Sequence, residues 1–140
     1  IKKIYIAGPL FNVHEKKYLE EIAEVLEGAD FECFLPHRDQ KGIDPEELKN
    51  NEMSQETKDI IFQTDIEALK EADLIVALVT GQDIDSGTAS EIGFMYANNK
   101  PVIAITAEER RYRNLFTAGM FTKTVHNIQE VLSSVEQFNS

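Results

Sequence analysis

A group of polar side chains follows the most apolar segment of the chain. The run LIVALVT, residues 74–80, precedes several carboxylates and hydroxyls crowded between Asp83 and Glu91. An ionised carboxylate at a ligand-binding edge can act as a nucleophile toward an electrophilic sugar carbon. This segment is therefore the first candidate for chemistry, and Glu91 is its candidate nucleophile.

Glu91 also has a purely structural interpretation. The spacing Thr88-Ala89-Ser90-Glu91 matches the T-x-x-E capping box, in which the glutamate closes onto the backbone at a helix start. In that first turn, the positive end of the helix dipole would keep the carboxylate ionised at neutral pH. Spacing alone leaves the structural and the catalytic interpretation open.

Two neighbours of Glu91 are equally ambiguous. Asp85 precedes the predicted helix, where an aspartate often serves only as a cap, and it could also face a ligand. Gly87 would let a ligand approach the backbone closely, although an ordinary turn glycine explains it as well.

Asp65 and Tyr5 are candidates in other segments. Asp65 lies in a predicted helix, where a lone aspartate is usually a solvated surface group. Tyr5 lies in a predicted strand, where packing in the core is the default and a hydroxyl that reaches the strand end is the alternative. Neither residue is assigned a role by its position alone.

The histidines and the cysteine do not form a metal-binding pattern. His14, His37 and His126 are widely separated and show no metal-ligand spacing with one another or with Cys33. We therefore predict no metal site.

Phosphate-binding motifs are also missing from the sequence. Gly8 stands alone and forms neither the dinucleotide-binding nor the triphosphate-binding glycine pattern. The basic run Arg110-Arg111-Tyr112-Arg113 could hold a phosphate, or it could be a surface or subunit contact.

The elements that must position these residues alternate in periodicity. The predicted strands are β-branched runs at residues 3–7, 31–35, 74–80, 101–106 and 122–125. The predicted helices are amphipathic segments at residues 14–27, 55–72, 87–98 and 127–138. Residues 37–47 read as a long loop, and residues 107–120 show no clear pattern.

This alternation favours βαβ units around a parallel sheet. We predict one α/β domain over residues 1–140, a three-layer sandwich with a doubly wound, flavodoxin-like five-stranded parallel sheet of order 2-1-3-4-5. In such a sheet, ligands bind at the carboxyl ends of the strands near the point where the winding reverses. Those ends include residues 7–9, 36–42 and 80–91.

Composition excludes several partners. Fourteen Lys and Arg against 25 Asp and Glu give a formal net charge of −11, which repels polynucleotides and anionic membranes. The single cysteine cannot form an internal disulfide, and no apolar run is long enough to cross a bilayer. We expect a cytoplasmic protein with no nucleic-acid and no membrane partner.

Three segments together resemble the nucleoside 2-deoxyribosyltransferase family. They are Tyr5-Ile6-Ala7-Gly8-Pro9, Asp65 in the helix before the third strand, and the stretch D-x-G-T-A-x-E-x-G at residues 85–93. The resemblance covers nearly the whole chain, and the last stretch is its most specific part. It implies that Glu91 is the nucleophile, that Asp65 exchanges a proton with the base, and that Asp85 and Tyr5 line the deoxyribose site.

The same resemblance implies two further contacts. Gln40, in the loop after the second strand, would contact the base, and Asn114 of the pair Asn114-Leu115 would reach a neighbouring subunit's site. A shared site implies a homo-oligomer, at least a dimer, and the family implies a hexamer. We include Gly8 and Gly87 among the predicted substrate-binding residues, and we expect no cofactor.

The implied reaction exchanges the base of a 2′-deoxynucleoside with a free purine or pyrimidine base. It would proceed through a covalent deoxyribosyl ester on Glu91, with retention of the β configuration. The alternative is hydrolysis of a nucleoside or its 5′-monophosphate by the same glutamate, with the hydroxyls of Ser86 and Ser90 favouring a phosphate. A third alternative is a non-catalytic receiver-like domain. Receivers need an acidic pair at the end of the first strand, where this chain instead has Ala7-Gly8-Pro9.

Overall fold

The chain folds around a five-stranded sheet. A computed structural model describes residues 1–40, 42–43, 46, 53–81, 83–107 and 114–139. Its strands are β1 (Lys3–Ala7), β2 (Glu32–Phe34), β3 (Leu74–Leu78), β4 (Val102–Ile105) and β5 (Lys123–Val125). Neighbouring strands all run parallel in the order β2-β1-β3-β4-β5, which confirms the predicted flavodoxin-like α/β fold.

In the described part of the chain, a helix follows each strand. They are α1 (Val13–Gly28), α3 (Gln55–Glu71), α4 (Ser86–Ala97), α5 (Leu115–Ala118) and α6 (Ile128–Phe138). The four longer ones begin at a polar cap that accepts a backbone N–H bond: Asn12, Ser54, Asp85 and Asn127. The sequence does not predict α5, because four residues show little more than one helical period. In the described part of the chain, no helix has both the length and the apolar character needed to cross a membrane.

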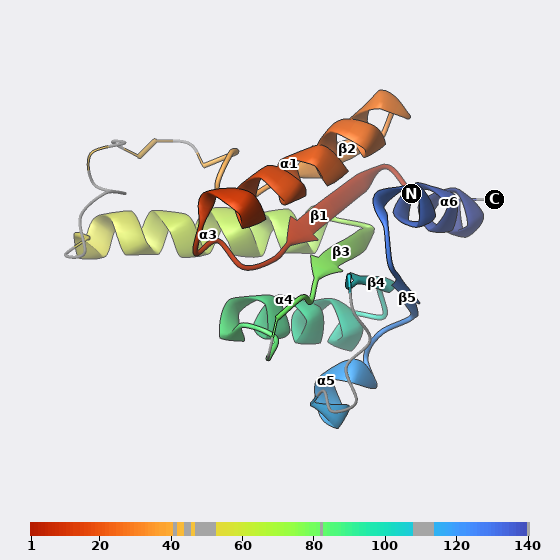
Figure 1. The fold of residues 1–140 in the computed structure, drawn as a ribbon. Helices are drawn as coiled ribbons and strands as arrows, with labels where there is room; N and C mark the ends of the chain where they lie inside the picture. The colour runs from red at the N-terminus through yellow and green to blue at the C-terminus, as the bar shows by residue number, and fades with distance from the viewer. Residues whose placement is uncertain (41, 44–45, 47–52, 82, 108–113, 140) are drawn as a thin grey trace.

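Helices cover both faces of the sheet (Figure 1). Each face has its own apolar core. Because side chains alternate along a strand, Ile4 and Ile6 pack with α1 and α6, whereas Tyr5 and Ala7 pack with α3 and α4. Every residue of β3 is buried, as a central strand covered on both faces requires.

The winding reverses at β1. The chain passes from β1 to β2 on one side and then returns across β1 to β3 on the other. The carboxyl ends of β1 and β3 are therefore the expected place for a ligand crevice. Gly8 follows one of these ends, and the segment that leads to Asp85 follows the other.

Candidate active site

A cavity opens at this carboxyl edge, on the face covered by α3 and α4. Its volume is ≈ 500 Å³, which is in the usual range for small-molecule sites. Five of the predicted site residues line it: Gly8, Asp65, Asp85, Gly87 and Glu91. The fold thus brings together candidates from three separate segments of the chain.

Glu91 is held against Tyr5 at the cavity. The Tyr5 hydroxyl donates a hydrogen bond to Glu91 Oε2. Burial raises the pKa of the Glu91 carboxyl to about 7; the Tyr5 hydrogen bond opposes this rise, and the charges of Asp65 and Asp85 add to it. The carboxyl therefore populates both protonation states near neutral pH, and the expectation that a helix dipole keeps it ionised is wrong.

The capping-box interpretation of Glu91 fails as well, because α4 begins earlier than that interpretation requires. Asp85 is the N-cap: its carboxylate accepts the Thr88 N–H at 3.3 Å and also the Thr88 hydroxyl. Glu91 consequently lies in the second turn, with its carboxyl on Tyr5, and the capping box at Thr88 is wrong. The structural role considered for Asp85 is confirmed, and the same residue also lines the cavity.

Asp65 is paired with Gln40 from the loop after β2. Gln40 Nε2 donates to Asp65 Oδ1 at 2.7 Å, and Gln40 Oε1 is buried with no partner among the described residues. Burial raises the pKa of the Asp65 carboxyl, while the hydrogen bond from Gln40 lowers it in part. Asp65 is therefore not the solvated surface group typical of a lone helical aspartate. A carboxyl with a raised pKa is suited to general acid catalysis.

Both interpretations of Tyr5 hold. Its ring is fully buried and stacks on Phe34, with ring centroids 5.4 Å apart and planes inclined by 26°. Burial, followed by the charges of Glu91 and Asp65, raises the pKa of the Tyr5 hydroxyl far above its usual range. The hydroxyl thus stays a donor and reaches the cavity through Glu91, without lining it.

The two cavity glycines serve different purposes. A Cβ at Gly8 would lie 2.8 Å from Leu19 Cδ2 and 3.0 Å from Leu78 Cβ, so packing alone requires this glycine. A Cβ at Gly87 would meet only Asp85 Oδ2, at an ordinary 3.5 Å. The fold tolerates a side chain at Gly87, so its absence serves chiefly to leave the cavity open.

Asn114 does not line the cavity of its own chain. It caps α5, where its Oδ1 accepts the Thr117 N–H at 3.0 Å. The next two residues, Leu115 and Phe116, are 87% and 79% exposed. The contact of Asn114 with a neighbouring subunit stays a prediction. The basic run Arg110 to Arg113 lies outside the described residues.

An apolar wall was missed by the sequence reasoning. It consists of Leu10, Phe11, Pro36, Phe62, Ile66, Leu69 and Phe94. Phe62 and Phe11 are 61% and 78% exposed, which is unusual for large apolar side chains outside a binding surface. Helical spacing gives a usable signal, since Phe62, Asp65, Ile66 and Leu69 share one face of α3.

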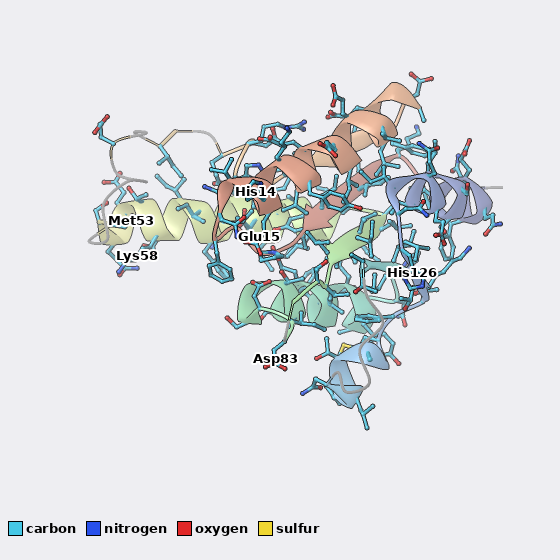
Figure 2. The ribbon with its side chains drawn as sticks, in the orientation of Figure 1. His14, Glu15, Met53, Lys58, Asp83 and His126 are labelled. Carbon is cyan, nitrogen blue, oxygen red and sulfur yellow. The ribbon has the colours of Figure 1, made fainter. Side chains whose placement is uncertain are left out.

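Other polar candidates lie away from the cavity. Asp83 is exposed and projects from the turn before α4 (Figure 2). His14 lies at the start of α1, while His126 precedes α6 (Figure 2). Within the residues that the structure describes, no three His, Cys, Asp or Glu side chains are grouped to hold a metal ion.

Solved structures with the same fold include three informative ones. A conserved protein from Enterococcus faecalis V583 shares 28% identity at a TM-score of 0.80, covering 98% of both chains. A 2-deoxyribosyltransferase from Bacillus psychrosaccharolyticus shares 26% identity at a TM-score of 0.79, covering 92% of this chain and 89% of that one. The CMP N-glycosidase BcmB of Clostridium botulinum, at 23% identity and a TM-score of 0.62, covers 96% and 99% and shows the fold alone.

Sequence comparison assigns the family directly. A search of curated protein sequences finds no match. The family model described as nucleoside 2-deoxyribosyltransferase, however, matches residues 4–138, which contain all of the cavity. Because this match spans nearly the full length, the chain belongs to the nucleoside 2-deoxyribosyltransferase family.

Proposed function

We propose that this protein transfers 2-deoxyribose from one nucleobase to another, with Glu91 as the nucleophile. The observation that carries the proposal is the Glu91 carboxyl, buried against the Tyr5 hydroxyl in a cavity that Asp65 and Asp85 also line. The fold shared with the Bacillus psychrosaccharolyticus 2-deoxyribosyltransferase supports the same activity.

In the first half-reaction, the ionised Glu91 carboxylate attacks C1′ of the nucleoside. A C1′–O ester bond forms while the C1′–N bond breaks, and its electron pair stays on the base nitrogen. Asp65 delivers a proton to the departing base, in keeping with its raised pKa. The product is a deoxyribosyl ester with inverted configuration at C1′.

In the second half-reaction, a nitrogen of the incoming base attacks C1′ from the side that the first base left. The C1′–O bond breaks, and the carboxylate of Glu91 is regenerated. Asp65, now ionised, takes the proton that the incoming base must lose. Two inversions restore the β configuration, and neither step uses a cofactor.

The charges at the cavity favour a neutral nucleoside. Asp85 and the ionised Glu91 line the cavity in which C1′ becomes positive as the C1′–N bond breaks, and their negative charge would stabilise the transition state. Among the described residues that line the cavity there is no lysine or arginine to hold a 5′-phosphate. The Ser90 hydroxyl donates to the Ser86 carbonyl at 2.8 Å, so it is already engaged within the helix.

The apolar wall provides the face on which a base would lie. Phe11 and Phe62 present exposed rings at the cavity, and aromatic rings stack well on planar bases. Gln40 does not line the cavity itself, but its Oε1, which has no partner among the described residues, would accept a hydrogen bond from a base that reaches Asp65. Asn114 would complete the site of a neighbouring subunit, which makes a homo-oligomer the active form.

The test is incubation of deoxyinosine with and without adenine. Adenine-dependent appearance of deoxyadenosine supports transfer, whereas free deoxyribose in equal amounts in both incubations supports hydrolysis and overturns the proposal. Glu91→Gln provides the control, because it keeps the side-chain shape and removes the nucleophile. Unimpaired exchange in this variant would remove Glu91 from the mechanism.

A further inference from the structure

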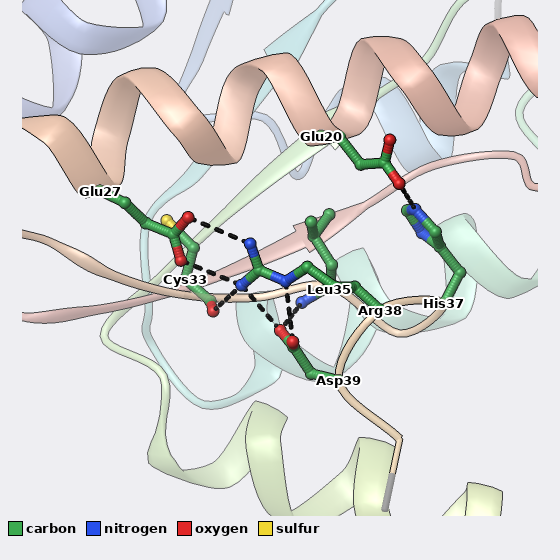
Figure 3. Close-up of polar contacts among 7 residues, drawn as sticks. All are labelled: Glu20, Glu27, Cys33, Leu35, His37, Arg38 and Asp39. Atoms are coloured by element: carbon green, nitrogen blue, oxygen red, sulfur yellow. Dashed lines mark hydrogen bonds and ion pairs between the residues drawn. The ribbon is translucent and has the colours of Figure 1, made fainter.

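Arg38 is the centre of a network that joins the turn after β2 to α1 (Figure 3). Its Nη1 and Nη2 donate to the two carboxylate oxygens of Glu27, both at 3.0 Å. Its Nε and Nη2 donate to the two oxygens of Asp39, at 2.8 and 2.9 Å, and Nη2 also donates to the Cys33 carbonyl at 3.0 Å. The guanidinium group thus binds two carboxylates and one backbone carbonyl at once.

The same network closes the turn on itself. The Leu35 carbonyl accepts the N–H groups of Arg38 and Asp39, at 3.0 and 2.9 Å. In return, the Asp39 carboxylate accepts the Leu35 N–H at 2.9 Å. The residue that follows this closed turn is Gln40, whose amide reaches across to Asp65 in α3.

We propose that Arg38 is a positioning residue for deoxyribosyl transfer, fixing the turn at residues 35–39 so that Gln40 meets Asp65. The inference rests on the proposed function for its effect on activity. Its structural part, the coupling of Arg38 to the Gln40–Asp65 contact, can be tested without any substrate.

The geometry of the contacts explains why this arginine can position a neighbour. Exposed ion pairs usually contribute little to the stability of a fold, because flexible side chains lose entropy when they pair and water screens the charges. The contact between Lys3 and Glu71, a single one at 3.4 Å, is of that kind. Arg38 instead makes bidentate contacts to two carboxylates, which fix the planar group in direction as well as in position.

The protonation states are consistent with a permanent network. Hydrogen bonds to Asp39 and Glu27 raise the pKa of Arg38, so it stays charged. Burial acts to raise the pKa of Asp39, but hydrogen bonds from Arg38 and the Leu35 N–H prevail and lower it. A second contact, His37 Nε2 to Glu20 Oε1 at 3.2 Å, joins the same turn to α1.

The first experiment compares Arg38→Met with Lys3→Met. Both variants remove one positive charge from an ion pair, but Lys3 lies at the start of β1 and does not line the cavity. We expect Arg38→Met to lower kcat by about 10- to 100-fold, the effect of a small misplacement of a catalytic group, and Lys3→Met to leave it unchanged. Equal kcat in Arg38→Met and wild type would overturn the proposal.

A double-mutant cycle separates positioning from a general loss of stability. If Arg38 acts through Gln40, Arg38→Met should cause no further loss of kcat in the Gln40→Ala background. Losses that multiply would show that Arg38 acts by another route and would overturn the proposal. Should Arg38→Met fail to fold, Glu27→Gln gives a milder break of the same network and enters the same cycle.

A substrate-free measurement keeps this inference separate from the proposed function. The carboxyl carbon of Asp65 is titrated by ¹³C NMR in the Glu91→Gln background, because Glu91 and Tyr5 are the titratable groups that interact with Asp65 within the described part of the chain. The Gln40 hydrogen bond lowers the pKa of Asp65, so both Gln40→Ala and Arg38→Met should raise that pKa. An unchanged titration in Arg38→Met would overturn the positioning role, whatever reaction the enzyme catalyses.

Discussion

The two faces of the sheet differ in the size of the side chains that the strands contribute. The face covered by α1 and α6 carries isoleucine, leucine and valine along β1, β3 and β4. The opposite face carries a row of three alanines near the carboxyl edge, because Ala7 pairs with Ala77 and Ala77 pairs with Ala104. The cavity opens at the same edge of this second face.

This difference separates stability from chemistry. Large side chains fill the space under α1 and α6, and Gly8 is packed tightly against Leu19 and Leu78 of that core. Small side chains on the other face leave depth near the edge, where three carboxyl groups approach one another. We therefore expect substitutions on the first face to change the free energy of unfolding and those at the cavity to change the rate.

The largest effect is expected for Glu91→Gln on base exchange. The amide cannot form the ester, so kcat should fall by at least about 10⁴-fold, in line with the removal of other nucleophiles. Product formation from deoxyinosine and adenine measures it. Calorimetric titration with deoxyinosine is the control, since the cavity is unchanged in shape and binding should persist. An activity above one tenth of wild type would contradict the assignment.

Asp65→Asn comes next. Loss of the proton donor should lower the rate of base release by about 10²–10⁴-fold for ordinary deoxynucleosides. N7-methyl-2′-deoxyguanosine is the matched substrate, because its cationic base leaves without being protonated. Single-turnover release of 7-methylguanine should therefore be nearly normal in this variant. An equal loss with both substrates would show that Asp65 does not act as the acid.

Leu26→Ala tests the opposite face. Leu26 is fully buried in the core under α1, and its truncation should lower the free energy of unfolding by about 2–5 kcal/mol. Urea unfolding measures the loss. At a temperature where the variant stays folded, kcat should equal that of wild type. A tenfold fall in kcat would mean that the two faces are not functionally separate.

Ionisation of Glu91 should also lower the free energy of unfolding of the protein as the pH rises. Its pKa of about 7 in the folded state exceeds its ordinary value of 4.5, so the folded protein holds the proton more tightly than the unfolded chain. Stability is then highest at low pH, is lost as the pH rises from 4.5 to about 7, and changes little above that. The full loss corresponds to about 3 kcal/mol.

Glu91→Gln removes this dependence. By urea unfolding, the variant should be more stable than wild type by about 3 kcal/mol at pH 8. At pH 5.5, this difference in the free energy of unfolding should be smaller by about 2 kcal/mol. Asp73→Asn serves as the control, since this aspartate lies at the amino edge, where it accepts the Lys2 and Lys3 N–H groups. Because the pKa of Asp73 is lowered in the folded protein, this aspartate contributes a pH dependence of stability of the opposite sign. A gap for Glu91→Gln that is constant with pH would contradict the raised pKa.

The fold was predictable because periodicity determines it. The apolar runs of β1, β3 and β4 and the amphipathic segments between them are strong local signals, and the order β2-β1-β3-β4-β5 is one of the two common orders of a doubly wound sheet. The prediction that Glu91, Asp85 and Asp65 are site residues rests on a local motif and on the family resemblance of that motif. Their presence in one cavity agrees with that prediction.

What the sequence could not give depends on contacts between distant residues. The capping box at Thr88 failed because Asp85 competes for the same N–H group, and only backbone geometry decides between two caps. The raised pKa of Glu91 follows from burial, which the hydrogen bond from Tyr5, 86 positions away, opposes only in part. Phe62 has a helical-spacing signal, but Phe11 lies in another segment without a motif, and only folding brings the two rings together in the apolar wall.

The smallest expected effect is that of Tyr5→Phe, which sharpens the comparison at the boundary between core and cavity. The Tyr5 ring belongs to the core, so phenylalanine should keep its packing on Phe34 and cost little stability. The hydroxyl lowers the pKa of Glu91, and its loss should raise that pKa by about one pH unit.

Because kcat/KM reports the ionisation of the free enzyme, the acid limb of its pH profile should move upward by the same amount. At pH 6.5 the rate of Tyr5→Phe should then be several-fold below that of wild type, and by pH 9 the two rates should be nearly equal. Phe34→Leu is the control, because it alters only the stacking partner and should leave the acid limb in place. A uniform loss of rate at every pH would mean that the hydroxyl acts on the sugar, and that core and cavity meet at Tyr5 in a different way.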